Sequence, residues 1–236
     1  MKLTSLLSTI ALAASTSLAM GDSPQAFTPV GELNINTSLV QVGVKPVLNW
    51  NISFPSNDVE DVITINDDDS ITTDQAVHME VRLLGAAFST NGVTPSPVQF
   101  LTRTGPGLWN NTFFGTEDDI NPAQVLISQE VSAGVDIDFA ARGRLGSFSW
   151  TPYRHTLSES FNVIALKDGD DIPTYAPAFN QNTIEDHVSA YVQDGKISIG
   201  PREVIYLFEL FTTNTRSSAF DLQDVVVIVT FDEIED

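Results

Sequence analysis

Short stretches in which apolar and polar residues alternate recur along this chain, and turn-forming residues separate them. In residues 76–84 the apolar residues at positions 77, 79, 81 and 83 alternate with His78, Glu80 and Arg82. Residues 135–141 repeat the pattern, with Asp136 and Asp138 on the polar side. A period of two is typical of a β-strand that buries one face, so we expect strands in both places.

Two runs near the C-terminus, 204–211 and 225–231, are apolar at nearly every position. A strand that is apolar on both faces belongs in the middle of a covered sheet. Asp221 and Asp224 precede the second run. Charged residues beside an aggregation-prone strand help to keep it soluble. We expect this strand to insert centrally into its own sandwich, beside 204–211 or another strand. The alternative is self-assembly, in which it completes a neighbouring subunit.

The dipeptide Asp194-Gly195 is the strongest local turn signal, because both residues tolerate the positive φ of a type I′ turn. It predicts a hairpin with three facing pairs: Gln193–Lys196, Val192–Ile197 and Ala190–Ile199. The apolar pairs fall on one face, which supports this register.

The chain as a whole has about ten strand candidates and no helical periodicity sustained over 12 residues. Many short strands with polar turns between them predict an all-β fold with little helix. We expect a β-sandwich of the immunoglobulin-like or jelly-roll type. No internal repeat or linker divides it, so residues 31–236 are predicted to form a single β-sandwich domain.

The N-terminus carries the pattern of a cleavable signal peptide. Lys2 precedes an apolar stretch over residues 3–18, and Ser17 and Ala19 are small, as signal peptidase requires. We therefore expect residues 1–19 to be a signal peptide and residues 20–30 to be a flexible lead-in. No later apolar run is long enough to cross a bilayer. The prediction is a secreted protein, extracellular, at the cell surface or periplasmic, without membrane insertion.

Composition narrows the classes of partner and of chemistry. The net charge is -20, which repels nucleic acid and anionic membrane surfaces. There is no Cys, so an exported chain of this kind must depend on its core rather than on disulfides. The three His have no zinc-ligand spacing, and no nucleophile motif occurs. Asp136 and Asp138 have a spacing that glycosidases use, but a solvated strand face explains them better. We therefore assign no catalytic residue.

Acidic turns make Ca²⁺ the metal to consider, because this ion prefers several oxygen ligands. The best candidates are Asp168, Asp170 and Asp171, since Gly169 allows the sharp backbone turn of a chelating loop. The acidic segments 66–69 and 117–121 are weaker candidates. The alternative for each of them is a solvated turn that binds no ion.

Three aromatic residues lie in or near predicted loops: Trp109, Trp150 and Tyr153. Flat aromatic rings beside amide side chains suit the binding of sugars, so these are the candidate ligand-binding residues. The alternative is that they cap the ends of the sandwich core, as large aromatic side chains often do.

These observations favour an exported, non-enzymatic β-sandwich protein with a structural or adhesive role at the cell surface or outside the cell. The alternative is a carbohydrate-binding module or a secreted glycan-active protein. A glycan or another surface would then be the partner.

Overall fold

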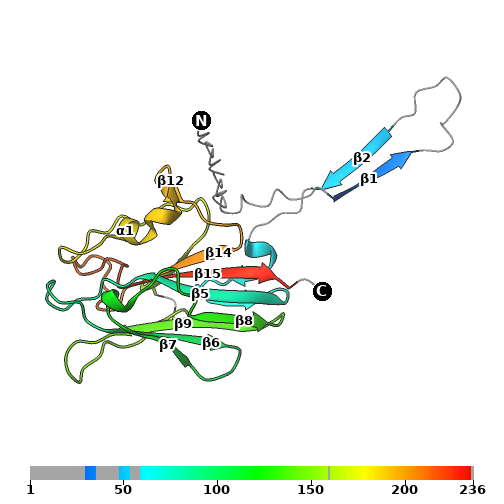
Figure 1. Ribbon diagram of the computed structural model, residues 1–236. Coiled ribbons are helices and arrows are strands. Elements are labelled where there is room, and N and C mark those ends of the chain that lie inside the picture. Colours follow the sequence, from blue (N-terminus) through cyan, green and yellow to red (C-terminus); the bar gives the residue numbers. More distant parts are fainter. Residues whose placement is uncertain (1–29, 36–47, 54–58, 159, 235–236) are drawn as a thin grey trace, which may run out of the picture. The chain divides into compact units, whose positions relative to one another are not determined.

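The computed structural model describes residues 30–35, 48–53, 59–158 and 160–234 of the chain (Figure 1). The chain divides between Pro55 and Ser56 into two units. In the first unit, β1 (Val30–Ile35) pairs antiparallel with β2 (Leu48–Ser53). The predicted signal peptide and all but the last residue of the predicted lead-in lie outside the described residues.

The second unit is a sandwich of two antiparallel sheets, as the alternating pattern predicts. The first sheet has the strand order β11-β14-β15-β5-β8. Its strands are β5 (Val77–Gly85), β8 (Ile127–Val131), β11 (Val163–Leu166), β14 (Glu203–Phe208) and β15 (Val225–Glu233). We call it the five-stranded sheet. Figure 1 shows β14, β15 and β5 as one layer and β9, β6 and β7 as another.

The second sheet has six strands in the order β3-β4-β9-β6-β7, with β10 also paired to β9. Its strands are β3 (Ile63–Ile65), β4 (Ile71–Thr73), β6 (Val98–Thr104), β7 (Asn110–Gly115), β9 (Asp136–Gly143) and β10 (Arg154–His155). We call it the six-stranded sheet. The strands β8 and β9 flank Gly134 but belong to different sheets, so this connection crosses from one layer to the other.

Aromatic side chains fill the space between the sheets. Phe139 of β9 stacks on Phe100 of β6 at 5.9 Å and meets Tyr206 of β14 at 4.9 Å between ring centroids. Phe208 approaches Phe100 edge-on at 6.0 Å. All four side chains are fully buried, and the Tyr206 hydroxyl donates to the backbone oxygen of Asp69 at 2.9 Å. The core therefore depends on side chains from both layers.

A second apolar cluster covers the outer face of the five-stranded sheet. It joins alternate residues of β14 and β15 to Ile184 and Val188 of α1 (Ile184–Val188), to Ile197, and to Phe220 and Leu222 of the β14–β15 connection. Both faces of β14 and β15 are thus covered by the same chain. This explains why residues 204–208 and 225–229 are apolar at every position.

Short elements complete this cover. The one α-helix of the described residues is α1, and it continues into the 3₁₀ turn η4 (Ser189–Tyr191). Two further 3₁₀ turns are η2 (Val59–Asp61) and η3 (Glu117–Asp119). No helix in the described ranges is long and apolar enough to cross a membrane.

The hairpin of β12 (Val192–Gln193) and β13 (Lys196–Ile197) has the predicted register. Asp194 and Gly195 have φ values of 53° and 78°, as a type I′ turn requires. Two of the three predicted pairs form. The pair of Ala190 and Ile199 does not, because the chain before Val192 turns into η4.

The C-terminal strand β15 lies between β14 and β5, with Val225 opposite Phe208 and Val229 opposite Val81. The prediction that this strand inserts centrally into its own sandwich is confirmed, and its two neighbours are β14 and β5. The acids that precede this strand were expected to keep it soluble, but Asp221 and Asp224 are buried.

Candidate functional site

Three carboxylates meet where the two most buried strands are joined. Glu209 directly follows β14, Asp224 directly precedes β15, and Asp221 lies in the segment that connects them. The backbone N–H of Asp224 donates to the Phe208 oxygen at 3.1 Å, which fixes the two strand ends side by side. One oxygen from each carboxylate lies within 4.8 Å of the others, and all three residues are buried. We call this group the acidic cluster.

Backbone N–H groups surround part of the acidic cluster. Glu209 accepts from the N–H groups of Phe211 at 2.8 Å, Thr212 at 2.9 Å and Asp221 at 2.9 Å. Asp224 accepts from the N–H of Leu210 at 2.6 Å. These donors hold the carboxylates in place. They carry only partial positive charge.

Two buried oxygens beside the acidic cluster accept no hydrogen bond from the protein. They are Oδ1 of Asp221 and Oε1 of Gln223. The Gln223 amide nitrogen donates to Oδ2 of Asp221 at 3.3 Å, so its oxygen cannot be exchanged for the nitrogen without losing that bond. Asp221 and Asp224 also form part of the wall of a cavity of about 210 Å³.

The acidic cluster has perturbed acid–base properties. Burial raises the pKa of Glu209 and of Asp221, and it raises the pKa of Asp224 well above the ordinary aspartate value. The negative charges of Glu209 and Asp221 raise the pKa of Asp224 further. Such a group could hold a metal ion, because a cation would compensate the three charges.

The sequence contains a signal for this cluster. Glu209 interrupts an apolar run, and a charged residue inside a buried strand needs a compensating group. The sequence interpretation instead treated Asp221 and Asp224 as flanking charges. Which side chains would meet Glu209 depends on the β14–β15 pairing, and sequence alone did not identify that contact.

The predicted calcium turn has a different arrangement. Oδ1 of Asp168 accepts from the N–H of Ile199 at 3.1 Å, and Oδ2 of Asp170 accepts from the N–H of Lys167 at 2.7 Å. Asp171 forms an exposed ion pair with Lys196 at 2.9 Å. The turn thus attaches the β12–β13 hairpin to the sandwich. Its three carboxylates form their hydrogen bonds and ion pair at three separate positions.

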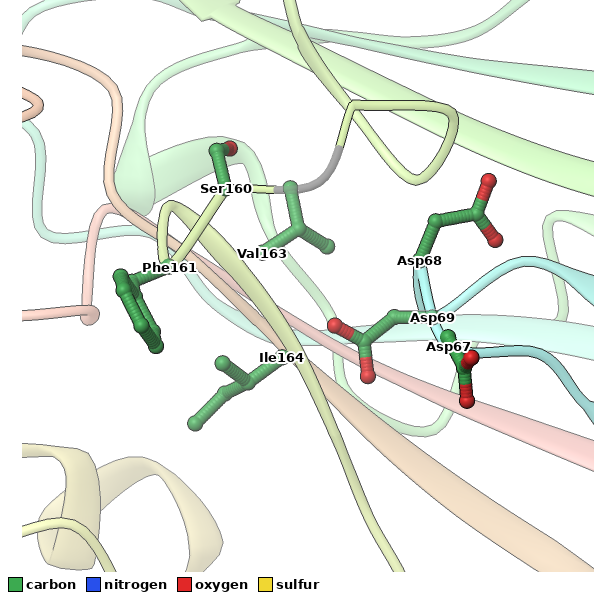
Figure 2. Close-up of a pocket in the computed structure, with 7 residues that line it drawn as sticks. All are labelled: Asp67, Asp68, Asp69, Ser160, Phe161, Val163 and Ile164. Carbon is green, nitrogen blue, oxygen red and sulfur yellow. The ribbon is translucent and has the colours of Figure 1, made fainter.

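A second acidic segment lines a hollow of about 450 Å³ (Figure 2). The carboxylates of Asp67, Asp68 and Asp69 point apart, with Phe161 and Ile164 across from them (Figure 2). Asp68 accepts from Ser70, and Asp69 accepts from the N–H of Ala165 at 3.2 Å. The three carboxylates therefore do not converge on one point.

The third acidic segment, 117–121, uses its side chains locally. Asp119 accepts from the N–H and the hydroxyl of Thr116 at 2.8 and 3.0 Å, which caps η3. Glu117 accepts from the amide of Asn182 at 2.6 Å.

Trp150 and Tyr153 are brought together on the outer face of the six-stranded sheet. The guanidinium of Arg142, on β9, lies 4.4 Å from the centroid of each of the two rings. Gln99 of β6 accepts from Arg142 at 2.8 Å and from the Tyr153 hydroxyl at 3.0 Å, and it donates to Asn111 at 2.8 Å. We call Gln99, Arg142, Trp150 and Tyr153 the aromatic–arginine cluster.

The edge of this cluster is exposed and adjoins a hollow. Phe114 packs against Trp150 at 6.0 Å and is 53% exposed, and Tyr153 is 37% exposed. Arg144 lies 5.9 Å from the Trp150 ring and lines a hollow of about 500 Å³ between residues 90–97 and 144–147. Hydroxyl and amide side chains make up much of the wall of that hollow.

Trp109 lies apart from the aromatic–arginine cluster. Its ring packs under the guanidinium of Arg103 at 5.1 Å, and Arg103 binds the fully buried Asp138 through Nε at 2.9 Å and Nη2 at 2.6 Å. The expectation of a solvated face at Asp136 and Asp138 is wrong for Asp138, because it is buried and paired.

The hydroxyl of Ser158 donates to the backbone oxygen of His155 at 2.8 Å, not to its ring. His187 is packed against Gly85 on the far side of the five-stranded sheet from the core.

No protein-family model, curated protein or solved structure matches this chain.

Proposed function

We propose that this protein is an exported, non-enzymatic adhesive module that binds carbohydrate through the outer face of its six-stranded sheet. The observation that carries the proposal is the aromatic–arginine cluster. Export is proposed from the N-terminal pattern of residues 1–19.

The two outer sheet faces differ, and this difference supports a binding role. The outer face of the five-stranded sheet is covered by α1, the β12–β13 hairpin and the β14–β15 connection. On the six-stranded sheet, Phe114 and Tyr153 remain exposed beside Arg142 and Gln99. Ring faces present apolar area to sugar C–H groups, while guanidinium and amide groups form hydrogen bonds with hydroxyls. A small number of fixed polar groups among aromatic rings is the usual composition of a ligand site.

The charges of this face favour an acidic carbohydrate, one that carries carboxylate or sulfate groups. In the described residues no carboxylate forms an ion pair with Arg142 or Arg144. A guanidinium held between rings is preoriented, and it recognises carboxylate and sulfate oxygens through paired N–H donors.

Binding is favoured over glycan hydrolysis by the state of Asp138. Hydrolysis of a glycosidic bond usually needs two carboxyl groups that reach the substrate. Asp138 is fully buried beneath Arg103, and Asp136 accepts from the Thr72 hydroxyl at 2.9 Å. Asp138 therefore lacks the access that catalysis requires.

Calcium belongs to the proposal as a structural ion. A chain with 31 Asp plus Glu offers the oxygen ligands that Ca²⁺ prefers. A bound ion would stabilise a secreted fold that has no disulfide.

The test is a binding screen on neutral and acidic polysaccharides, followed by calorimetry with the best ligand. Arg142→Ala and Tyr153→Ala should each weaken binding about tenfold, because each removes an interaction worth roughly 1–2 kcal/mol. Phe161→Ala is the matched control, since Phe161 is 74% exposed and precedes β11 of the other sheet. Absence of binding to every polysaccharide, or unchanged affinity in both variants, would overturn the proposal.

A further inference from the structure

The acidic cluster carries negative charge that no positively charged side chain of the described residues compensates through an ion pair. No lysine, arginine or histidine of the described ranges forms an ion pair with Glu209, Asp221 or Asp224. Buried charges of like sign destabilise one another strongly where the dielectric constant is low. The cluster must therefore either take up protons or bind a cation.

The two unpartnered oxygens distinguish these possibilities. A proton shared between two carboxylates supplies a hydrogen bond to one acceptor. Oδ1 of Asp221 and Oε1 of Gln223 are separate buried acceptors, and both lack a donor. A cation that contacts both oxygens would satisfy them together, which a single shared proton would not do.

We infer that Glu209, Asp221 and Asp224, with the side-chain oxygen of Gln223, form a binding site for one Ca²⁺ ion. This inference deepens the calcium part of the proposed function and is independent of carbohydrate binding. It moves the ion from the turn at Asp168, Asp170 and Asp171 to the junction of β14 and β15.

The chemistry of the donors selects the type of ion. All candidate ligands are oxygens, which suits Ca²⁺ and Mg²⁺ rather than Zn²⁺. Calcium–oxygen distances of about 2.3–2.6 Å place opposite ligands about 4.6–5.2 Å apart, whereas Mg²⁺ places them about 4.0–4.2 Å apart. The three carboxylate oxygens all lie within 4.8 Å of one another, which is close enough for one Ca²⁺ ion to contact all three. Water from the cavity of about 210 Å³ would complete the six to eight ligands.

The position of the site gives the ion a structural role. Glu209 and Asp224 belong to the two strand ends, and Asp221 accepts from the N–H of Ala178 at 2.9 Å. One ion would thus join β14, β15, their connection and the segment around Ala178. It would also hold Leu222, a buried residue with a φ of 58°, in a backbone conformation that leucine rarely adopts.

The experiment is calorimetric titration of the chelator-treated full chain with CaCl₂ alone, together with melting curves in EDTA and in Ca²⁺. We expect one ion per chain and, at a hundredfold excess over Kd, a rise in Tm of roughly 5–10 °C. Asp221→Asn and Gln223→Met should each abolish or strongly reduce this rise. In EDTA, Asp221→Asn should melt at or above the temperature of the unmutated protein, because it removes a repulsive charge.

Asp170→Asn is the matched control, because it changes one carboxylate of the exposed turn and should keep the full Ca²⁺ response. If Asp170→Asn loses the response and Asp221→Asn keeps it, the ion binds the turn; our assignment is then wrong, and the proposed calcium requirement stands. Absence of heat and of any Tm change at millimolar Ca²⁺ would mean that the cluster only shares protons. Both the assignment and the calcium requirement would then fail, while the carbohydrate test would be unaffected. If Asp221→Asn does not fold, Gln223→Met gives the same comparison.

Discussion

The ion pair of Arg103 and Asp138 provides a direct test of how the six-stranded sheet is stabilised. Asp138 has an exposed side-chain fraction of 0% and Arg103 one of 25%. Two of the Arg103 donors bind the same carboxylate oxygen, at 2.9 and 2.6 Å. The Thr156 hydroxyl donates to the other oxygen of this carboxylate over a long distance of 3.5 Å. Arg103→Ala would therefore leave a buried charge with one weak partner.

The expected loss of stability follows from these contacts. Breaking a buried ion pair by removing one partner costs about 3–5 kcal/mol, and partial exposure of Arg103 places this pair near the lower end. Loss of the contact with the Trp109 ring adds about 0.5–1 kcal/mol. We expect Arg103→Ala to lower the free energy of unfolding by about 3–4 kcal/mol. For a domain of this size the Tm should fall by roughly 6–16 °C.

The assay is urea unfolding followed by tryptophan fluorescence and, independently, by circular dichroism. Adding Asp138→Asn to Arg103→Ala should regain most of the loss, because the buried charge is then removed. Lys196→Ala is the control, since its exposed pair with Asp171 should contribute about 1 kcal/mol or less. A loss below about 1 kcal/mol for Arg103→Ala would refute the reasoning, because it would mean that water reaches Asp138.

Three further changes test other contacts of the fold. Gly85→Ala would place a Cβ atom 1.9 Å from Nδ1 of His187, so it should destabilise the protein by about 1–3 kcal/mol in urea unfolding. Adding His187→Ala to the same chain should relieve most of that loss, because it removes the clashing ring. Phe139→Ala should cost about 3–5 kcal/mol in the same assay, because it empties the centre of the core. Burial lowers the pKa of His187 below 6.5, so the stability that its neutral ring contributes is present above that pH and is lost as the pH falls through the lowered pKa. The difference in unfolding free energy between the unmutated protein and His187→Gln should therefore shrink between about pH 7.5 and pH 5, and an unchanged difference would contradict this.

The strand pattern was predictable because it depends on local periodicity. The alternation in residues 76–84 corresponds to β5, and the turn at Asp194 has the predicted register. The pairing of distant strands was not predictable in the same way. The strands β8 and β9 are separated by one short turn and still belong to opposite sheets, because only long-range packing decides which neighbour each strand finds. The short α1 also escaped prediction, since five residues cannot show helical periodicity.

The candidate sites show the same limit. Trp150 and Tyr153 were chosen from their loop context, but Arg142 and Gln99, which join them, are supplied by β9 and β6 from elsewhere in the sequence. The acidic turn at Asp168 was chosen because its acids are close in sequence and Gly169 allows a sharp backbone turn. Consecutive residues on a turn tend to point apart, whereas the carboxylates that converge come from positions 209, 221 and 224.

A net charge of -20 is compatible with recognition of an acidic carbohydrate. At physiological ionic strength the screening length is about 8 Å, so acids farther than this from a bound ligand contribute little repulsion. The guanidinium groups of Arg142 and Arg144 lie beside the Trp150 ring, at distances shorter than this screening length. Among the described residues, neither arginine forms an ion pair with a carboxylate. Arg103, in contrast, forms an ion pair with Asp138. The charge of the arginine that contacts the Trp109 ring is therefore already compensated within the protein. The local balance of charge therefore supports the proposal that the face around Arg142 binds an acidic carbohydrate, and it gives the pair at Arg103 a structural role.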